Sequence, residues 1–213
     1  MDSKMKKSMI WSFLYLVIEI MLLQLFKFQM ETKFLYIGLL GLVYILINAF
    51  WVKYHRERLF INGMISYITV IMVGALFGSY LEVTEAIAIG ATISVIDVLS
   101  FTRSGKRTAN AKAMSNVNFM SKLIVYGAGK DDALYPTCGI GDYFYFALWL
   151  TGLSKNETML LILGAGLVLG NIINKVIICK LSKKPNYKGL PATIVPFVCV
   201  VVFYFLFAIK FAE

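Results

Sequence analysis

The sequence predicts an all-α membrane protein: a polytopic bundle of about seven transmembrane helices with a short cytoplasmic β element between helices four and five. Two observations predict this class. Of the 213 residues, 59% are hydrophobic and 15% charged, with a mean hydropathy of +0.75, which leaves too little polar surface for a soluble globule. The apolar residues also gather into runs near the length of about 20 residues that a bilayer span needs.

Seven apolar runs are expected to form the spans, and the fifth is the shortest. They are 8–26, 34–52, 59–81, 84–101, 139–154, 157–180 and 190–210. The first run follows a basic start, as in a signal peptide, but it is too long and lacks a small-residue cleavage site, so we expect it to be retained. The runs divide the chain into a three-helix scaffold (1–83) and a second membrane region (84–213) with a cytoplasmic loop at 102–138.

Basic residues indicate the orientation of these spans. The N-terminus and the loops after spans two, four and six hold most of them: Lys4, Lys6, Lys7, Lys53, Arg56, Arg58, Arg103, Lys106, Arg107, Lys112, Lys122, Lys130, Lys180, Lys183, Lys184 and Lys188. The positive-inside rule therefore predicts a multi-pass protein of the cell membrane with a cytoplasmic N-terminus and an extracytoplasmic C-terminus. The net charge of +9 points to the anionic headgroups of the lipid bilayer as partner, not to nucleic acid, because no soluble domain presents the charges.

The loop at 102–138 contains two patterned segments. Thr108–Met120 has apolar residues about one turn apart, which predicts a short amphipathic helix on the membrane surface. Lys122–Tyr126 is β-branched and aromatic and is followed by Gly127 and Gly129, which predicts a short strand.

Small and polar residues within the spans predict helix contacts. The pairs Gly74 with Gly78, and Gly166 with Gly170, have the four-residue spacing that lets membrane helices approach closely. Five other polar residues are expected to form interhelical hydrogen bonds or to snorkel, with a water path to the site as the alternative: Glu19, Asn48, Asn171, Asn174 and Lys175.

Two aspartates lie at matching shallow depth near the cytoplasmic ends of spans four and five. A carboxylate in a membrane span is costly, so Asp97 and Asp142 require a functional explanation. Gly90, Ser94 and Asp97 recur at helical spacing with Phe101, which predicts that this stripe faces the bundle interior.

A pair of buried carboxyl groups can supply both an acid and a base. Two such groups within a few ångströms cannot both ionise easily, so one keeps its proton near neutral pH. The ionised group can then take a proton from water while the neutral group donates to a peptide carbonyl, which is general acid–base hydrolysis. Gly139 and Gly141 would allow close backbone approach and positive φ beside Asp142.

No metal or organic cofactor is expected, and water is the implied reagent. Cys138, Cys179 and Cys199 are scattered singly and His55 is the one histidine in the chain, so neither a zinc ligand set nor a disulfide framework can be assembled.

These residues resemble a known family. The segment from Gly139 to Tyr145 resembles the GxGD motif of the presenilin and signal peptide peptidase family of intramembrane aspartyl proteases, and Asp97 falls where that family has its other catalytic aspartate. The segment Gly189–Thr193 is similar to the family's Pro-Ala-Leu motif. The motif order and the cytoplasmic side of the loop match the presenilin orientation and suggest a compact prokaryotic relative, for example an archaeal one.

The resemblance implies that 84–213 is catalytic, that Asp97 and Asp142 are the catalytic residues and that transmembrane proteins or peptides are the substrates. The residues that would shape the site or bind substrate are Gly139, Ile140, Gly141, Leu190, Pro191, Ala192, Leu123, Ile124, Val125 and Tyr126. The last four would pair with an unwound substrate, since cleavage requires a helix to release its backbone hydrogen bonds. A homo-oligomer is left open.

The chain departs from the family pattern at three points. Ile96 replaces the usual tyrosine before the first aspartate, Thr193 replaces the leucine of Pro-Ala-Leu, and three spans precede Asp97 where the family usually has five. Pro191 also has a purely structural interpretation, because proline is common in the first turn of a helix.

Three other functions are compatible with the sequence. A type IV prepilin peptidase-like protease also uses a GxGD aspartate, but the segment after Asp97 lacks its usual Pro-Asn element. A proton-coupled transporter would use the two aspartates as a relay. A non-catalytic relative acting as a membrane chaperone would keep the motifs without a competent site.

Overall fold

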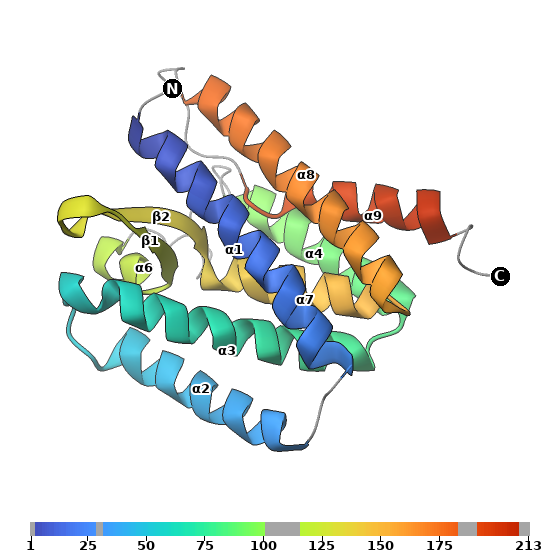
Figure 1. Cartoon of the computed structure of the whole chain (residues 1–213), viewed down its shortest axis with the longest axis horizontal. Helices are drawn as coiled ribbons and strands as arrows, with labels where there is room; N and C mark the ends of the chain where they lie inside the picture. The colour runs from blue at the N-terminus through green and yellow to red at the C-terminus, as the bar shows by residue number, and fades with distance from the viewer. Residues whose placement is uncertain (1–2, 29–31, 101–115, 183–190, 209–213) are drawn as a thin grey trace.

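The computed structural model describes residues 3–28, 32–100, 116–182 and 191–208. It is a helical bundle with a two-stranded sheet at one end (Figure 1). The helices are α1 (Ser3–Phe28), α2 (Thr32–Phe50), α3 (Leu59–Tyr80), α4 (Val83–Ser100), α6 (Val117–Lys122), α7 (Ile140–Leu153), α8 (Glu157–Leu181) and α9 (Ile194–Ala208). The strands are β1 (Ile124–Ala128) and β2 (Leu134–Gly139), and two short 3-10 turns are η1 (Arg56–Arg58) and η3 (Lys130–Asp132).

Each of the seven predicted apolar runs overlaps one of these helices, which confirms the predicted helical class. Four described segments are long and apolar enough to cross a membrane: Ser3–Phe26, Arg56–Tyr80, Val83–Ser100 and Glu157–Leu181. Phe34–Phe50 and Ile194–Phe207 are shorter apolar helices. With 14 residues, α7 rises about 21 Å, less than the hydrocarbon thickness of about 30 Å.

The short helix α7 lies at the centre of the bundle. It contacts α1, α3, α4, α8 and α9, and most of its side chains are buried. Tyr143 packs edge-on against Tyr67 of α3, with ring centroids 4.9 Å apart, and Trp149 packs against Phe197 of α9 at 5.0 Å. An aromatic core therefore runs from α3 through α7 to α9.

Glycine pairs permit the closest helix contacts, as predicted. On α3, a methyl group at Gly74 would stand 2.6 Å from the Phe144 carbonyl oxygen of α7, and one at Gly78 would overlap Thr151. On α8, a methyl group at Gly166 would stand 2.8 Å from the Phe203 ring of α9, and one at Gly170 would stand 2.6 Å from the Pro196 Cα. These positions leave no room for a side chain, because atoms of the facing helix occupy the space.

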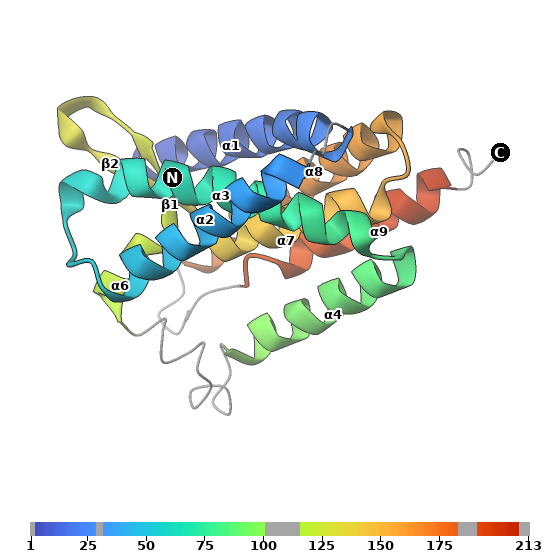
Figure 2. The same cartoon turned by 90° about the horizontal axis from the view of Figure 1, so that it is seen from below.

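In contrast, α4 lies apart from the rest of the bundle (Figure 2). Its main contacts are with α7 and α9. At the contact with α9, the ring of Phe197 packs directly against Gly90. Gly90 and Ser94 are buried, as the predicted inward stripe requires, whereas Phe101 lies outside the described residues.

The observed strand β1 begins and ends two residues later than the predicted strand, Lys122–Tyr126. Lys122 ends α6 and is not part of the strand, because its ammonium donates to the carbonyls of Asn48, Ala49 and Val52 at the end of α2, at 3.1, 3.0 and 2.6 Å. A cation at a helix C-terminus is favoured by the unpaired carbonyls there.

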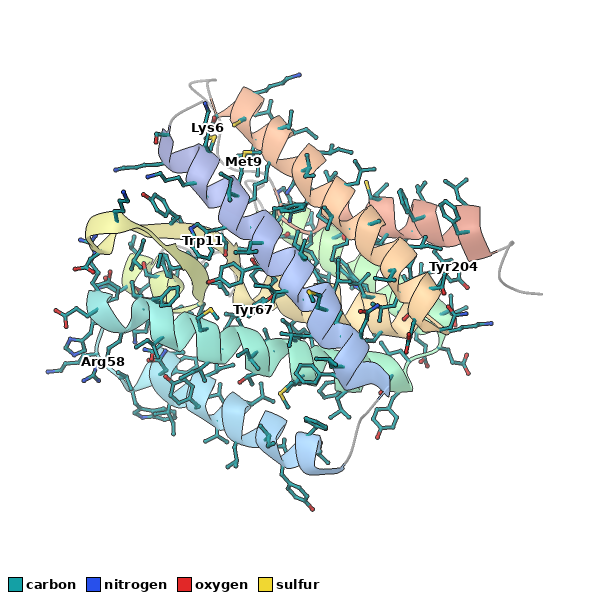
Figure 3. All side chains as sticks on the ribbon, viewed as in Figure 1. Lys6, Met9, Trp11, Arg58, Tyr67 and Tyr204 are labelled. Atoms are coloured by element: carbon teal, nitrogen blue, oxygen red, sulfur yellow. The ribbon has the colours of Figure 1, made fainter. Side chains whose placement is uncertain are left out.

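The strand also continues beyond its predicted end. Gly127 lies within β1 opposite Tyr135, and its missing side chain leaves room for the ring of Trp11, which lies beside the hairpin in Figure 3. The partner strand β2 was not predicted, because Pro136 interrupts the alternating pattern and proline is confined to sheet edges. In the predicted helix Thr108–Met120, 108–115 lie outside the described residues, and α6 begins at Val117 after the cap Asn116.

The described basic segments share the end of the bundle that carries the hairpin. Lys7 donates to the Tyr135 hydroxyl at 3.1 Å, Arg56 borders a cavity with the tip of the hairpin, and Met5 contacts Cys179 near the end of α8. Figure 3 shows Lys6 and Arg58 toward this end and Tyr204 toward the other. This arrangement agrees with the predicted alternation of charge along the chain.

Candidate active site

Asp97 and Asp142 line one cavity of about 740 Å³ at the hairpin end of the bundle. Its wall is built from α4, α6, the hairpin, the start of α7, the last third of α8 and the segment before α9. The lining residues are Ile93, Ile96, Asp97, Phe119, Met120, Leu123, Ile124, Pro136, Thr137, Cys138, Gly139, Ile140, Gly141, Asp142, Tyr145, Asn171, Asn174, Lys175, Ile178, Ala192 and Thr193. The fold thus brings together two carboxyl groups that are 45 positions apart in the sequence.

The start of α7 positions Asp142. It is the third residue of the helix, half-buried, and its Oδ2 accepts a hydrogen bond of 2.9 Å from the backbone N–H of Gly139. This is half of a capping box, in which an acidic side chain returns to the residue that precedes the helix. Asp142 therefore also stabilises the start of α7, and experiments must separate this role from chemistry.

Asp97 is positioned by a contact from outside its own helix. Its Oδ2 lies 2.7 Å from the hydroxyl of Thr193, which is buried just before α9. Asp97 is half-buried, interacts electrostatically with Asp142, and both carboxyls interact with Tyr145. The two aspartates therefore lie in the wall of the same cavity, each held by a contact from another segment.

The Pro191–Thr193 segment is held against the site by α8. The Asn174 amide donates to the carbonyls of Pro191 and Ala192 at 3.3 and 3.4 Å, and Ala192 and Thr193 line the cavity. Pro191 precedes the first residue of α9 by three positions, so the first-turn interpretation of this proline is not met; Pro196 occupies that turn instead.

Neither glycine of the GxGD motif adopts positive φ. Gly139 has φ −67° and ψ 152°, an extended conformation open to any residue, and Gly141 is also outside the left-handed region. The positive φ that these glycines would allow is therefore not used, whereas open space beside the aspartate is present. A methyl group at Gly141 would meet nothing within 4 Å, and one at Gly139 would stand 3.3 Å from Oδ2 of Asp142.

The structure separates the other predicted site residues into two groups. Leu123, Ile124 and Ile140 line the cavity with the glycines. Val125 and Tyr126 do not: Val125 is fully buried, and the Tyr126 carbonyl accepts a hydrogen bond of 2.8 Å from Tyr15. Strand β1 packs against α3 and α1, and a register shift between Ile124 and Tyr126 interrupts its regular alternation, which sequence alone could not show. Leu190 lies outside the described residues.

The polar residues of α8 belong to the site. Asn171, Asn174 and Lys175 follow the i, i+3, i+4 spacing of one helix face and line the cavity. Asn174 also donates to the carbonyls of Pro191 and Ala192, so it joins α8 to the segment before α9 and not to another helix. Their common spacing was the available signal that they act together.

The two other intramembrane polar residues differ from each other. Asn48 of α2 accepts a hydrogen bond of 3.1 Å from Asn62 of α3, as predicted. Glu19 is fully buried, yet neither carboxyl oxygen has a hydrogen-bond partner among the described residues, so its predicted interhelical bond is absent there.

The described residues contain no cluster of three histidine, cysteine or acidic side chains that could hold a metal ion. Comparisons with protein-family models, curated proteins and solved structures found no match to this chain.

Proposed function

We propose that this chain is an intramembrane aspartyl endopeptidase, which hydrolyses peptide bonds within or near transmembrane helices of membrane protein substrates. One observation carries the proposal. Asp97 of α4 and Asp142 of α7 come from different helices and line the same cavity. Carboxylate pairs in poorly solvated sites are suited to general acid–base chemistry.

In this mechanism the pair holds one proton between two carboxyls. The ionised carboxyl removes a proton from a water molecule, and the protonated carboxyl donates to the carbonyl oxygen of the scissile peptide bond. No covalent intermediate forms. The apparent titration steps belong to the pair, so the acid and base roles are shared between Asp97 and Asp142.

The cavity suits an apolar substrate segment. Isoleucine and leucine side chains form much of its wall, namely Ile93, Ile96, Leu123, Ile124 and Ile178. A transmembrane helix must unwind before cleavage, and its freed backbone groups then need partners. Strand β2 is better placed than β1 to supply these hydrogen-bond partners, because its residues Thr137 and Cys138 border the cavity. In β1, the Ile124 carbonyl faces Gly63 of α3.

The proposed membrane arrangement has seven spans, with α7 as a short span inside the protein. Its N-terminal end, which carries Asp142, lies at the same end of the bundle as the basic segments. The positive-inside rule places that end in the cytoplasm, so cleavage is expected near the cytoplasmic side of the membrane.

The Thr193–Asp97 hydrogen bond favours a presenilin-like protease over a prepilin peptidase-like one. It gives the Pro191–Thr193 segment a role in the site, as the resemblance to the Pro-Ala-Leu motif implies. A prepilin peptidase-like function leaves this segment without one.

The test is cleavage by the purified protein of single-span substrates in detergent, with products mapped by mass spectrometry. Asp97→Asn and Asp142→Asn are the test variants, and Asp132→Asn, at an exposed carboxyl outside the cavity, is the matched control. The proposal requires cleavage inside the span that both test variants lose and the control retains. Cleavage only outside the span would favour the prepilin peptidase-like function, and a lack of cleavage with proton-driven uptake into proteoliposomes would favour transport.

A further inference from the structure

We infer that Lys175 of α8 is a positioning residue for the aspartate pair, whose ammonium group balances the single negative charge that the pair carries in the cavity. This inference rests on the proposed function for its catalytic consequence. The evidence for it is the location of the side chain, its hydrogen bond and the charges around it.

Lys175 is a half-buried lysine directed into the site. Its Nζ donates to the carbonyl of Thr137 on β2 at 3.2 Å, and its charge interacts with Asp142. Lys175 is also the one lysine or arginine that lines the cavity among the described residues. An ammonium has three N–H donors, so two remain for the cavity and its carboxyls after the bond to Thr137.

The other titratable groups around Lys175 are few. Among the described residues that line the cavity they are Asp97 on α4, Cys138 on β2, and Asp142 and Tyr145 on α7. Lys122 of α6, a helix that also borders the cavity, donates to three carbonyls of α2. Among the described residues that line the cavity, Lys175 is therefore the one cation that can balance the negative charge of the pair.

A positive charge at this position has a defined effect on titration. Burial disfavours the singly charged pair relative to the fully protonated pair, and a nearby cation opposes that effect. Without the cation, the pair would lose each proton only at a higher pH. Lys175 thus favours loss of the first proton, the step that gives the pair its working, singly protonated form.

A purely structural role, in which Lys175 only ties α8 to β2, predicts something different. Loss of the hydrogen bond to Thr137 would lower stability or activity by the same factor at every pH. Lys175→Gln separates the two roles, because glutamine keeps an N–H donor but has no charge. Lys175→Arg keeps the charge, and Lys180→Gln removes an exposed charge from the same helix as a control.

The first measurement is the pH dependence of substrate cleavage for these variants. Lys175→Gln should move both limbs of the profile to higher pH by about 1 unit, the lower end of the effect of a nearby charge. Lys175→Arg and Lys180→Gln should retain the original profile. A profile for Lys175→Gln that superimposes on that of the unmodified protein, or a uniform loss across pH, would overturn the inference.

The second measurement needs no proteolysis. Infrared spectroscopy can follow the protonated carboxyl band of the pair during a pH titration, assigned by its loss in Asp97→Asn and Asp142→Asn. Its midpoint should rise by about 1 pH unit in Lys175→Gln. A shifted midpoint in a chain that cleaves nothing would support Lys175 while the protease proposal fails. An unchanged midpoint in a chain that cleaves would reject Lys175 while the protease proposal stands.

Discussion

Helices α3 and α4 both flank the central helix α7, yet they are attached to it very differently. In the most apolar stretch of each helix, 61% of α3 and 22% of α4 is buried. Helix α3 packs along α7 through Gly74 and Gly78. The contacts of α4 are fewer and include Ala86 against Gly152 of α7, Gly90 against Phe197 and Asp97 against Thr193. One carboxyl of the candidate site is thus carried by the central helix of the core, and the other by a sparsely packed helix.

The two carboxyls of the site are therefore held in different ways. Asp142 is positioned by the start of α7, whose burial is extensive, while Asp97 depends on Thr193 and Phe197 at the start of α9. The Pro191–Thr193 segment therefore connects α4 to the rest of the bundle. Substitutions in α3 should act mainly on stability, and substitutions at the α4–α9 contact should act mainly on activity.

The largest expected effect is loss of cleavage when either aspartate of the site is replaced. Asp97→Asn and Asp142→Asn should each lower the cleavage rate by about 1,000-fold, because acid–base groups commonly contribute 100- to 10,000-fold. The amide oxygen in Asp142→Asn can still accept the Gly139 N–H bond, so stability should change little, whereas Asp142→Ala should also lose about 1 kcal/mol of unfolding free energy. Cleavage assays and denaturant unfolding measure the two quantities. Equal stability of the Asn and Ala variants would contradict the capping role.

A matched pair of glycine variants tests the difference in packing. Gly74→Val forces a side chain into the α7 backbone and should lower the unfolding free energy by about 3 kcal/mol. Gly90→Val displaces the Phe197 ring and with it α4, so stability should fall by less than about 1 kcal/mol while the cleavage rate falls by about 10-fold or more. Similar stability losses in both variants would show that α4 is as firmly packed as α3.

Thr193 should have an intermediate effect. Thr193→Val keeps the shape but removes the hydroxyl that contacts Asp97, so the cleavage rate should fall by about 10-fold, as expected for one hydrogen bond to a charged group. Thr193→Ser should retain most of the activity. Steady-state kinetics of the two variants measure this, and equal rates would exclude a role for the hydroxyl.

The smallest effect is expected at Gly141. Gly141→Ala adds a methyl group to open space in the cavity, so the fold should accept it and α7 should gain up to about 1 kcal/mol in helix propensity. The KM for a substrate should rise because the methyl group occupies room that the substrate backbone would use. Thermal unfolding and KM are the measurements, and an unchanged KM would place the substrate elsewhere.

Much of this arrangement could be predicted from local patterns. Continuous apolar runs marked the helices, and four-residue glycine spacing marked the contacts of α3 with α7 and of α8 with α9, because both depend on residues close in sequence. The hairpin was harder. Strand β2 was not predicted, because Pro136 interrupts its alternating pattern. Lys122 was expected in the strand, but its ammonium contacts the distant end of α2, which local sequence does not reveal.

The helical class, the two carboxyls within apolar runs and the small residues between packed helices follow from composition and from spacing within a few turns of chain. The surroundings of the two carboxyls, in contrast, depend on how the helices pack. Thr193, which appeared as a departure from a motif, contacts Asp97, and Lys175, which could have snorkelled, enters the cavity. Such contacts join distant segments, and they are set by how the helices pack around α7, which no local pattern specifies.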